Sequence, residues 1–180
     1  MNNIEVIDNY LHKREHQLIY DYFTGALDKG DTANSCTWTF FPGCSMLGDE
    51  DNWFHFTQLI FASHTILSPS FDLMRPIIQK ENMSAIARIK ANCMIMTEQL
   101  KVFTNGFHCD FRGHLTTGIY YINSNDGYTL FENGTKVKSV ANRFCKFDCN
   151  LKHTATTCTN STTRLLINFN YHSHPKDETV

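Results

Sequence analysis

The sequence predicts a mainly β fold in which two helices pack on one face of a β-sandwich. Three observations support this. Helical periodicity is confined to roughly the first hundred residues, strand patterns and Asn/Gly-rich turns dominate after Gly106, and no segment repeats along the 180 residues. A chain of this length can enclose one sizeable core, so we expect a single domain over residues 1–180.

The first half of the sequence carries both predicted helices. Residues 4–11 open as a short strand and turn, and Asp8 or Asn9 is expected to cap a helix that runs to about Phe23. A second helix is expected to begin at Ser68 or Ser70. Alternating apolar residues predict strands at 37–41, 54–61 and 85–96, and polar composition predicts loops at 25–35, 49–52 and 97–106.

The second half reads as strands joined by tight turns. Strands are expected at 114–123, 142–148 and 164–171, and Asn133-Gly134 is typical of a hairpin turn. Within the first of these strands the side chains alternate between two faces. One face would carry Leu115, Thr117, Ile119 and Tyr121, and the other His114, Thr116, Gly118, Tyr120 and Ile122.

Composition excludes several classes of protein. The net charge is −2 with no long basic run, which argues against a duplex-DNA binder but permits a small nucleic-acid contact in a pocket. The seven cysteines are scattered and no signal peptide leads the chain, so we expect reduced thiols in the cytoplasm. No apolar run approaches the roughly 20 residues of a membrane-spanning helix. Oligomeric state is left open.

Residues 107–110, Phe-His-Cys-Asp, carry the strongest chemical signal. On an extended strand, His108 and Asp110 point to the same side and Cys109 points away, so the pair can hold one metal ion. His153 is the candidate third ligand. Two histidines and one carboxylate on one face of an ion form the facial triad of non-haem Fe(II) oxygenases. A lone H-x-D is common, so the assignment depends on the motifs further along the chain.

Other polar residues have competing interpretations. His114 would face away from Tyr121, and His12, His16, His55, His64, His172 and His174 are expected on the surface, in the core or in a polar tail. Arg164 opens an apolar strand and needs an anion, which is either a ligand or Asp148. Arg88, Lys90 and Asn92 alternate with apolar residues and face either a substrate cleft or water.

Five motifs occur in order between residues 106 and 171. They are H-x-D, Tyr-Tyr-Ile-Asn at 120–123, Asp-Gly-Tyr-Thr-x-Phe at 126–131, Asn-Arg-Phe-x-x-Phe-Asp at 142–148, and His153 followed eleven residues later by Arg164. Together they resemble the 2-oxoglutarate/Fe(II)-dependent dioxygenases, in particular the prolyl-4-hydroxylase-like branch and its short bacteriophage-encoded members. The first hundred residues match only loosely.

The resemblance implies a double-stranded β-helix, or jelly roll, with the N-terminal helices packed on its major sheet. Residues 1–100 would support a catalytic core at about 101–172. It implies Fe(II) held by His108, Asp110 and His153, with 2-oxoglutarate and O2 as cosubstrates and ascorbate as an accessory reductant. Arg164 would bind the C5 carboxylate of 2-oxoglutarate. The remaining cosubstrate-binding positions would be Tyr121, Thr117, Ile119 and Thr129, together with Asn168 on the face of Arg164.

The implied activity is hydroxylation of an unactivated C–H bond with release of succinate and CO2. A peptidyl, prolyl-type substrate is favoured, with a free metabolite or a nucleobase as alternatives, and the location would be the cytoplasm, that of the host for a phage protein. Two other classes compete: a metal-binding jelly-roll sensor without turnover, and a zinc hydrolase, which needs a general base near its water. Neither class accounts for the presence of Arg164 and Tyr121 at the positions where the family has its cosubstrate-binding residues. Departures from the family pattern are Asp126, where many relatives carry Gly, and the oxidisable Cys109 between the ligands.

Overall fold

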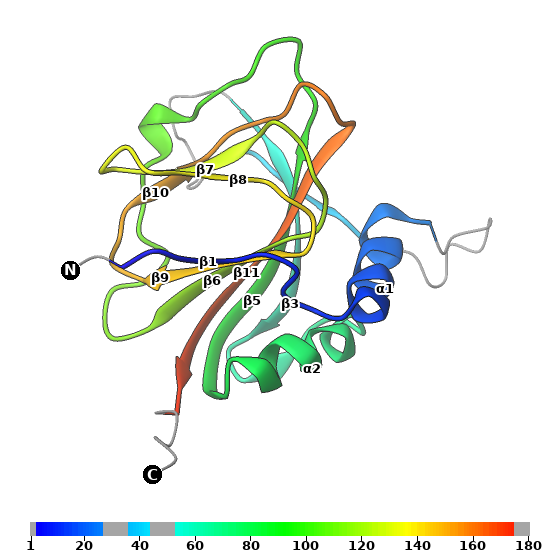
Figure 1. Cartoon of the computed structure of the whole chain (residues 1–180), viewed down its shortest axis with the longest axis vertical. Helices are drawn as coiled ribbons and strands as arrows, with labels where there is room; N and C mark the ends of the chain where they lie inside the picture. Colours follow the sequence, from blue (N-terminus) through cyan, green and yellow to red (C-terminus); the bar gives the residue numbers. More distant parts are fainter. Residues whose placement is uncertain (1–2, 27–35, 44–52, 175–180) are drawn as a thin grey trace.

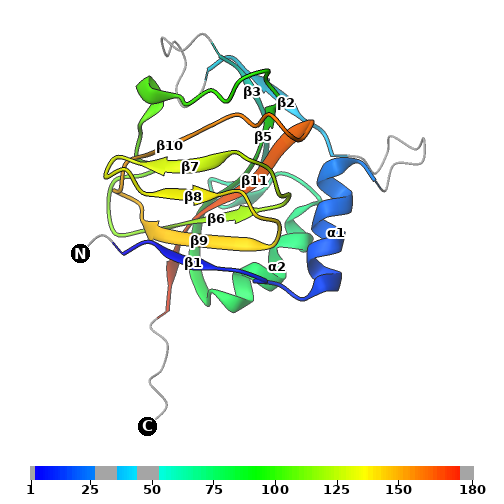
Figure 2. The ribbon, with the colours of Figure 1, turned by 45° about the horizontal axis from the view of Figure 1, so that its top comes forward.

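Two antiparallel β-sheets face each other, which confirms the predicted jelly roll (Figure 1). The computed structural model describes residues 3–26, 36–43 and 53–174. The larger sheet has the order β1 (Glu5–Ile7), β9 (Arg143–Asp148), β6 (Thr116–Tyr121), β11 (Thr163–Ser173), β5 (Met83–Ile95), β3 (His55–Ala62) and β2 (Thr39–Phe41), with β4 (Thr65–Ile66) paired to β3. The smaller sheet has the order β10 (His153–Ala155), β7 (Tyr128–Phe131) and β8 (Lys136–Lys138) (Figure 2).

Helices α1 (Lys13–Thr24) and α2 (Phe71–Lys80) cover the outer face of the larger sheet, as expected (Figure 1). Ile19 and Phe23 of α1 and Met74 and Ile77 of α2 are buried in one apolar core with the outward-facing residues of the sheet. This core anchors the sheet on one side and leaves its other side to face the smaller sheet. Ser70 is the N-cap of α2, in agreement with the sequence.

The predicted start of α1 is wrong. The helix begins at Lys13 with His12 as its N-cap, and the His12 backbone N–H donates to Glu15. Asp8 is unavailable as a cap because its two carboxylate oxygens accept bonds from Arg143 Nε and Nη2, at 2.6 and 2.9 Å. Asn9 turns the chain with a positive φ of 51°. A long-range ion pair therefore displaces the local capping preference by one turn.

The two longest strands, β5 and β11, lie together at the centre of the larger sheet and pair along their whole length. Side chains alternate on β6 as predicted: Tyr120 faces the helices, whereas Ile119 and Tyr121 face the smaller sheet. Gly118 on the helix-facing side contacts Phe144 of β9 so closely that a Cβ there would lie 2.4 Å from the ring. The expected loops at 25–35 and 49–52 fall largely outside the described residues.

The described cysteines Cys36, Cys93, Cys109, Cys145, Cys149 and Cys158 are all free thiols. No helix in the described ranges is long and apolar enough to cross a membrane.

A buried carboxylate joins the end of α2 to three other parts of the fold. Glu81 accepts hydrogen bonds from the phenols of Tyr10 and Tyr171, both at 2.9 Å, and pairs with Lys146 at 3.1 Å. Burial and the Glu81 charge raise the pKa of both phenols, so they stay protonated and donate. The N-terminal segment, α2, β9 and β11 are thereby connected at one point.

We predict that Glu81→Ala lowers the free energy of unfolding by about 3 kcal/mol, because two buried phenols and one amine lose their common acceptor. Urea denaturation followed by circular dichroism measures the change. Glu132→Ala is the matched control: Glu132 pairs with Lys152 at 3.1 Å on the surface, so its loss costs at most about 1 kcal/mol. Equal effects of the two substitutions would contradict the assigned role of Glu81.

Candidate active site

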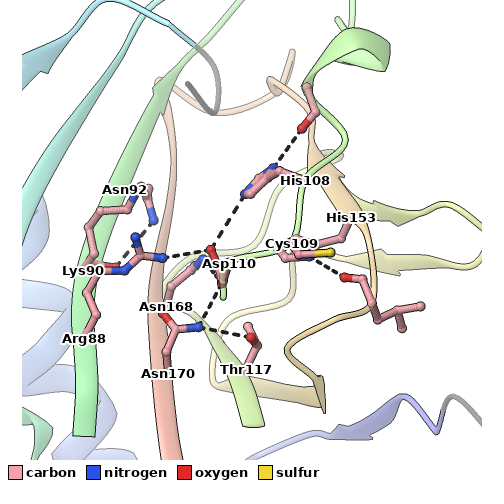
Figure 3. Close-up of polar contacts among 12 residues, drawn as sticks. Arg88, Lys90, Asn92, His108, Cys109, Asp110, Thr117, His153, Asn168 and Asn170 are labelled. Atoms are coloured by element: carbon pink, nitrogen blue, oxygen red, sulfur yellow. Dashed lines mark hydrogen bonds and ion pairs between the residues drawn. The ribbon is translucent and has the colours of Figure 1, made fainter. Parts of the chain in front are cut away.

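Three side chains that could hold a metal ion converge between the two sheets. One ligand atom from each of His108, Asp110 and His153 can be chosen so that all lie within 4.8 Å of one another, and His108 Nε2 is 3.7 Å from Asp110 Oδ1. His108 and Asp110 follow the 3-10 turn at Thr104–Gly106, and His153 opens β10. Figure 3 shows the side chains of His108 and Asp110 directed toward each other, with His153 on the facing strand.

The predicted extended strand through His108 and Asp110 is not formed. Asp110 lies in a bend, and His108 makes a single antiparallel bridge to His153. In this bridge each backbone N–H donates to the other residue's carbonyl, at 3.1 and 3.0 Å. The bridge places the first and third predicted ligands directly opposite each other. Cys109 points away from the triad as expected, since its thiol donates to the Asn150 carbonyl.

Both imidazoles are oriented by backbone carbonyls. His108 Nδ1 lies 2.8 Å from the Gly106 carbonyl and His153 Nδ1 lies 3.1 Å from that of Leu151. A proton on each Nδ1 would satisfy these bonds and leave Nε2 with a lone pair for a metal. Burial lowers the pKa of His153, so this ring is neutral near pH 7 and competent as a ligand.

Asp110 is almost fully buried and surrounded by donors (Figure 3). Arg88 Nη2 donates to its Oδ1 at 2.8 Å, and Asn170 Nδ2 donates to its Oδ2 at 3.1 Å, with Asn168 Nδ2 at 3.5 Å. Burial alone would raise the pKa of Asp110, but the hydrogen bonds and charges around it, including those of Asn170 and Arg88, outweigh burial and hold the pKa well below its usual value. The carboxylate is therefore ionised and held in one orientation.

The donor set fits Fe(II). Two imidazole nitrogens and one carboxylate oxygen on one side of an ion leave further positions open, which is the arrangement of non-haem Fe(II) sites. A zinc hydrolase would also need a general base beside the bound water. Among the described residues that line the cavity, Asp110 is the only carboxylate, so the geometry gives that alternative no support.

A cavity of about 270 Å³ adjoins the triad. Its walls come from the inner face of the larger sheet and from the smaller sheet. The larger sheet contributes Ile119, Leu166 and Asn168, and the smaller sheet contributes Thr129 and His153. Met94 of β5 and the polar Arg88, Lys90 and Asn92 of the same strand complete the wall, so the three polar residues face the cavity rather than bulk water.

Arg164 is completely buried behind one end of this cavity. Its Nε donates to Ser139 Oγ at 2.7 Å and its Nη2 to Thr129 Oγ1 at 3.3 Å. Thr129 Oγ1 is also 2.7 Å from the Tyr121 phenol oxygen. Tyr121 and Thr129 therefore both lie beside the Arg164 guanidinium. Asp148, the alternative partner for Arg164, instead accepts bonds from Asn150.

The backbone is fitted closely to this arginine. A Cβ at Gly127 would lie 2.6 Å from Arg164 Cδ and 2.6 Å from the Thr157 carbonyl. Position 127 therefore requires glycine for a packing reason. The neighbouring Asp126 departs from the family pattern, and its carboxylate accepts a hydrogen bond from the backbone N–H of Thr159. This bond connects the loop at Asp126 to the loop at Thr159.

Thr117 lies elsewhere than expected. The resemblance places it around the C5 carboxylate with Ile119 and Thr129, but its Oγ1 is 3.1 Å from Asn170 Nδ2 at the Asp110 end of the site. Ile119 and Thr129 do line the cavity. The exposed His114, His172 and His174 take no part in the triad.

Sequence reasoning missed three residues near the site: Asn170, His55 and Ser139, the last of which accepts the bond from Arg164 Nε. Asn170 holds Asp110 and could have been found, since it follows Asn168 at the spacing of one strand face. His55 lines the cavity, with Nδ1 2.8 Å from the Gly43 carbonyl, and nothing in its local sequence distinguishes it from a core histidine.

No protein-family model matches the sequence, and no curated protein is significantly similar to it. Solved structures are similar in fold. A 2OG-Fe(II) oxygenase family oxidoreductase from Burkholderia pseudomallei aligns with TM-score 0.64 and 11% identity, over 94% of this chain and 86% of that one. The chain has the fold of the 2-oxoglutarate/Fe(II) oxygenases.

Two further structures have the same fold. A Trichoplax adhaerens prolyl hydroxylase in complex with a peptide fragment of hypoxia inducible factor aligns with TM-score 0.59 and 13% identity, over 96% of this chain and 84% of that one. The epimerase SnoN, with Fe3+, alpha-ketoglutarate and nogalamycin RO, aligns with TM-score 0.63 and 9% identity, over 96% and 79%. At such identities the likeness concerns the fold alone.

We predict that alanine at His108, Asp110 or His153 weakens Fe(II) binding by more than ~100-fold, because each removes one of three ligands from a partly buried site. Anaerobic calorimetric titration with Fe(II) measures the affinity. His114→Ala should bind Fe(II) like the wild type. Undiminished binding in all three triad variants would reject the assignment.

Proposed function

We propose that this protein is a 2-oxoglutarate- and Fe(II)-dependent dioxygenase that hydroxylates an unactivated C–H bond. The observation that carries the proposal is the placement of His108, Asp110 and His153 beside a cavity that has Arg164 behind its far wall. The metal ligands at one end of the cavity fit the end of 2-oxoglutarate that would chelate iron. The buried guanidinium at the other end fits its second carboxylate. Neither feature alone would distinguish an oxygenase from a metal-binding sensor.

When bound, Fe(II) and 2-oxoglutarate supply the oxidising chemistry: O2 gives one oxygen atom to succinate, with loss of CO2, and the other to the new hydroxyl group. The chain holds these groups in place. His108 and His153 offer imidazole nitrogen ligands, and Asp110 stays ionised and oriented through Arg88 and Asn170. No protein acid or base is needed for a C–H hydroxylation, and the site's task is positioning.

Arg164 would bind the C5 carboxylate of 2-oxoglutarate. A guanidinium can donate two parallel bonds to a carboxylate, and such bonds are stronger in a shielded pocket. Thr129 and Tyr121 stand beside it with hydroxyl groups that can donate to the same carboxylate. Burial raises the pKa of Tyr121, which keeps its phenol protonated. The apolar Ile119 and Leu166 would pack along the carbon chain.

The fold alone leaves the substrate of this oxygenase open. A prolyl-type peptide is the substrate that the family resemblance suggests, and the Trichoplax prolyl hydroxylase was solved with a bound peptide. SnoN was solved with the small molecule nogalamycin RO on the same fold, so the fold alone does not choose between the two kinds of substrate. Relation to short bacteriophage enzymes, a cytoplasmic location and one domain over residues 1–180 are further predictions.

Turnover of 2-oxoglutarate tests the proposal directly. Purified protein with Fe(II), ascorbate, O2 and 2-oxoglutarate should form succinate, and omission of Fe(II), O2 or 2-oxoglutarate should stop it. A sensor would bind the ligands without forming succinate. A zinc hydrolase would form none with Fe(II) and would not need O2.

We predict that Arg164→Met raises the apparent KM for 2-oxoglutarate well over tenfold and keeps Fe(II) binding. Losing a charged bidentate contact in a buried pocket costs on the order of 2–5 kcal/mol, and each 1.4 kcal/mol is about tenfold. Tyr121→Phe should change KM in the same direction but less. Arg143→Met is the control, because Arg143 is committed to Asp8 outside the cavity. An unchanged KM in Arg164→Met would remove Arg164 from the proposal.

A further inference from the structure

Strand β5 gives the cavity a cationic wall. Arg88, Lys90 and Asn92 occupy alternating positions on its inner face, while the intervening Ile89 and Ala91 enter the core beneath the helices. Figure 3 shows the Arg88 guanidinium reaching from this strand toward Asp110. Beside this wall, on the neighbouring strands of the same sheet, Ile119 and Leu166 are apolar. Charged groups in a partly enclosed space are costly unless a counter-charge accompanies them.

The two cations of this wall are in different situations. Arg88 pairs with Asp110 at 2.8 Å, and its Cζ lies 5.1 Å from the centre of the Phe111 ring. Lys90 forms no ion pair with any residue in the described ranges. Burial, reinforced by the charge of Arg88 and opposed by that of Asp110, lowers the pKa of Lys90 to about 8. Lys90 is thus a cavity-lining cation without a partner from the described chain.

Binding of the metal and cosubstrate would not provide that partner. Asp110 would share its charge with the metal, which weakens its compensation of Arg88. Of the two carboxylates of 2-oxoglutarate, one would lie at the metal and the other at Arg164. An excess of positive charge therefore stays on the β5 wall after both have bound. An anion from a third molecule would neutralise it.

The sheet register separates Lys90 from the Arg164 end of the cavity. Lys90 is paired with Asn168 of β11, whose amide is 3.5 Å from Asp110 Oδ2, so Lys90 stands at the level of the triad. Arg164 is paired with Met94, four residues further along both strands, or ~13 Å. A carboxylate at Lys90 would lie beside the metal, where a substrate must present its C–H bond.

We propose that the primary substrate is a small free molecule with a carboxylate, and that Lys90, aided by Arg88 and Asn92, binds this carboxylate so that a neighbouring C–H bond faces the triad. This inference rests on the proposed oxygenase function. The volume agrees with it: a cavity of about 270 Å³ shared with 2-oxoglutarate is below the ~300–1,000 Å³ of typical drug-sized sites. A proline inside a peptide has no carboxylate for Lys90, whereas free proline and other free amino acids do.

Matched acids and amides test the inference by binding. Protein loaded with Mn(II) and 2-oxoglutarate, which binds without turnover, is titrated in a calorimeter with a panel of free amino acids including L-proline. Each acid is paired with its C-terminal amide, and N-acetyl-L-prolinamide represents a proline within a peptide. We expect at least one acid to bind at least tenfold more tightly than its amide. Equal affinities, or binding of no acid, would overturn the inference.

Substitution of Lys90 identifies the anchor. Lys90→Gln should weaken binding of the acid at least tenfold and leave its amide unaffected, and Lys90→Arg should recover part of the affinity. Lys152→Gln is the control, because Lys152 is half exposed and pairs with Glu132. Thermal unfolding followed by circular dichroism verifies that each variant is folded, and the neutral Lys90→Met replaces Lys90→Gln in the test if Lys90→Gln is not folded. Unchanged affinity for the acid in the folded variants would exclude Lys90.

The 2-oxoglutarate affinity, measured with Mn(II) alone, separates the two proposals. If the wild type binds no 2-oxoglutarate, the oxygenase function itself fails. If Lys90→Gln loses 2-oxoglutarate while Arg164→Met retains it, the anion of Lys90 is the cosubstrate and the inference is overturned. In turnover, the acid should accelerate succinate formation more than its amide does. Stimulation only by neutral prolyl peptides or nucleosides would contradict the inference while leaving the oxygenase function intact.

Discussion

The pairing register of β5 with β11 is the constraint on which the rest of the site depends. Side chains alternate strictly along a strand, so a slip by one residue would send every inward group outward. In the observed register Lys90 faces Asn168 and Met94 faces Arg164 across the two strands. The outward residues Ile89, Ala91, Ile167 and Phe169 are all fully buried beneath the helices. The apolar core thus fixes the register, and the polar wall results from it.

Sequence reasoning predicted the features that depend on local alternation. The two helices, the long strands and the faces of β6 follow from periodicity and turn residues, which act over short distances. The fold followed from ordered motifs in the second half. The role of β5 could not be settled this way, since Arg88, Lys90 and Asn92 alternate in the same manner whether they face a cavity or water.

The predictions that were wrong share a physical cause: a residue far away in the sequence binds a side chain or backbone group that was expected to act locally. Asp8 does not cap α1 because Arg143, far along the chain, takes its carboxylate. His108 and Asp110 need no strand between them, because the backbone of His153 holds His108 and the amide of Asn170 holds Asp110. Thr117 likewise bonds to Asn170. Such pairings become visible only when the strands are placed in space.

The Glu81 cluster gives the fold a mechanical property. Bonds from Tyr10, Tyr171 and Lys146 meet on a carboxylate at the end of α2, so the N-terminal segment, β9 and β11 cannot separate from this helix independently. Local opening in proteins occurs in cooperative units, and a shared buried acceptor merges neighbouring units into one. The opening that exposes amide protons of α2 to solvent should therefore have the same free energy as the opening that exposes those at the C-terminal end of β11. The polar network beneath the helices thus sets how much of the chain opens together.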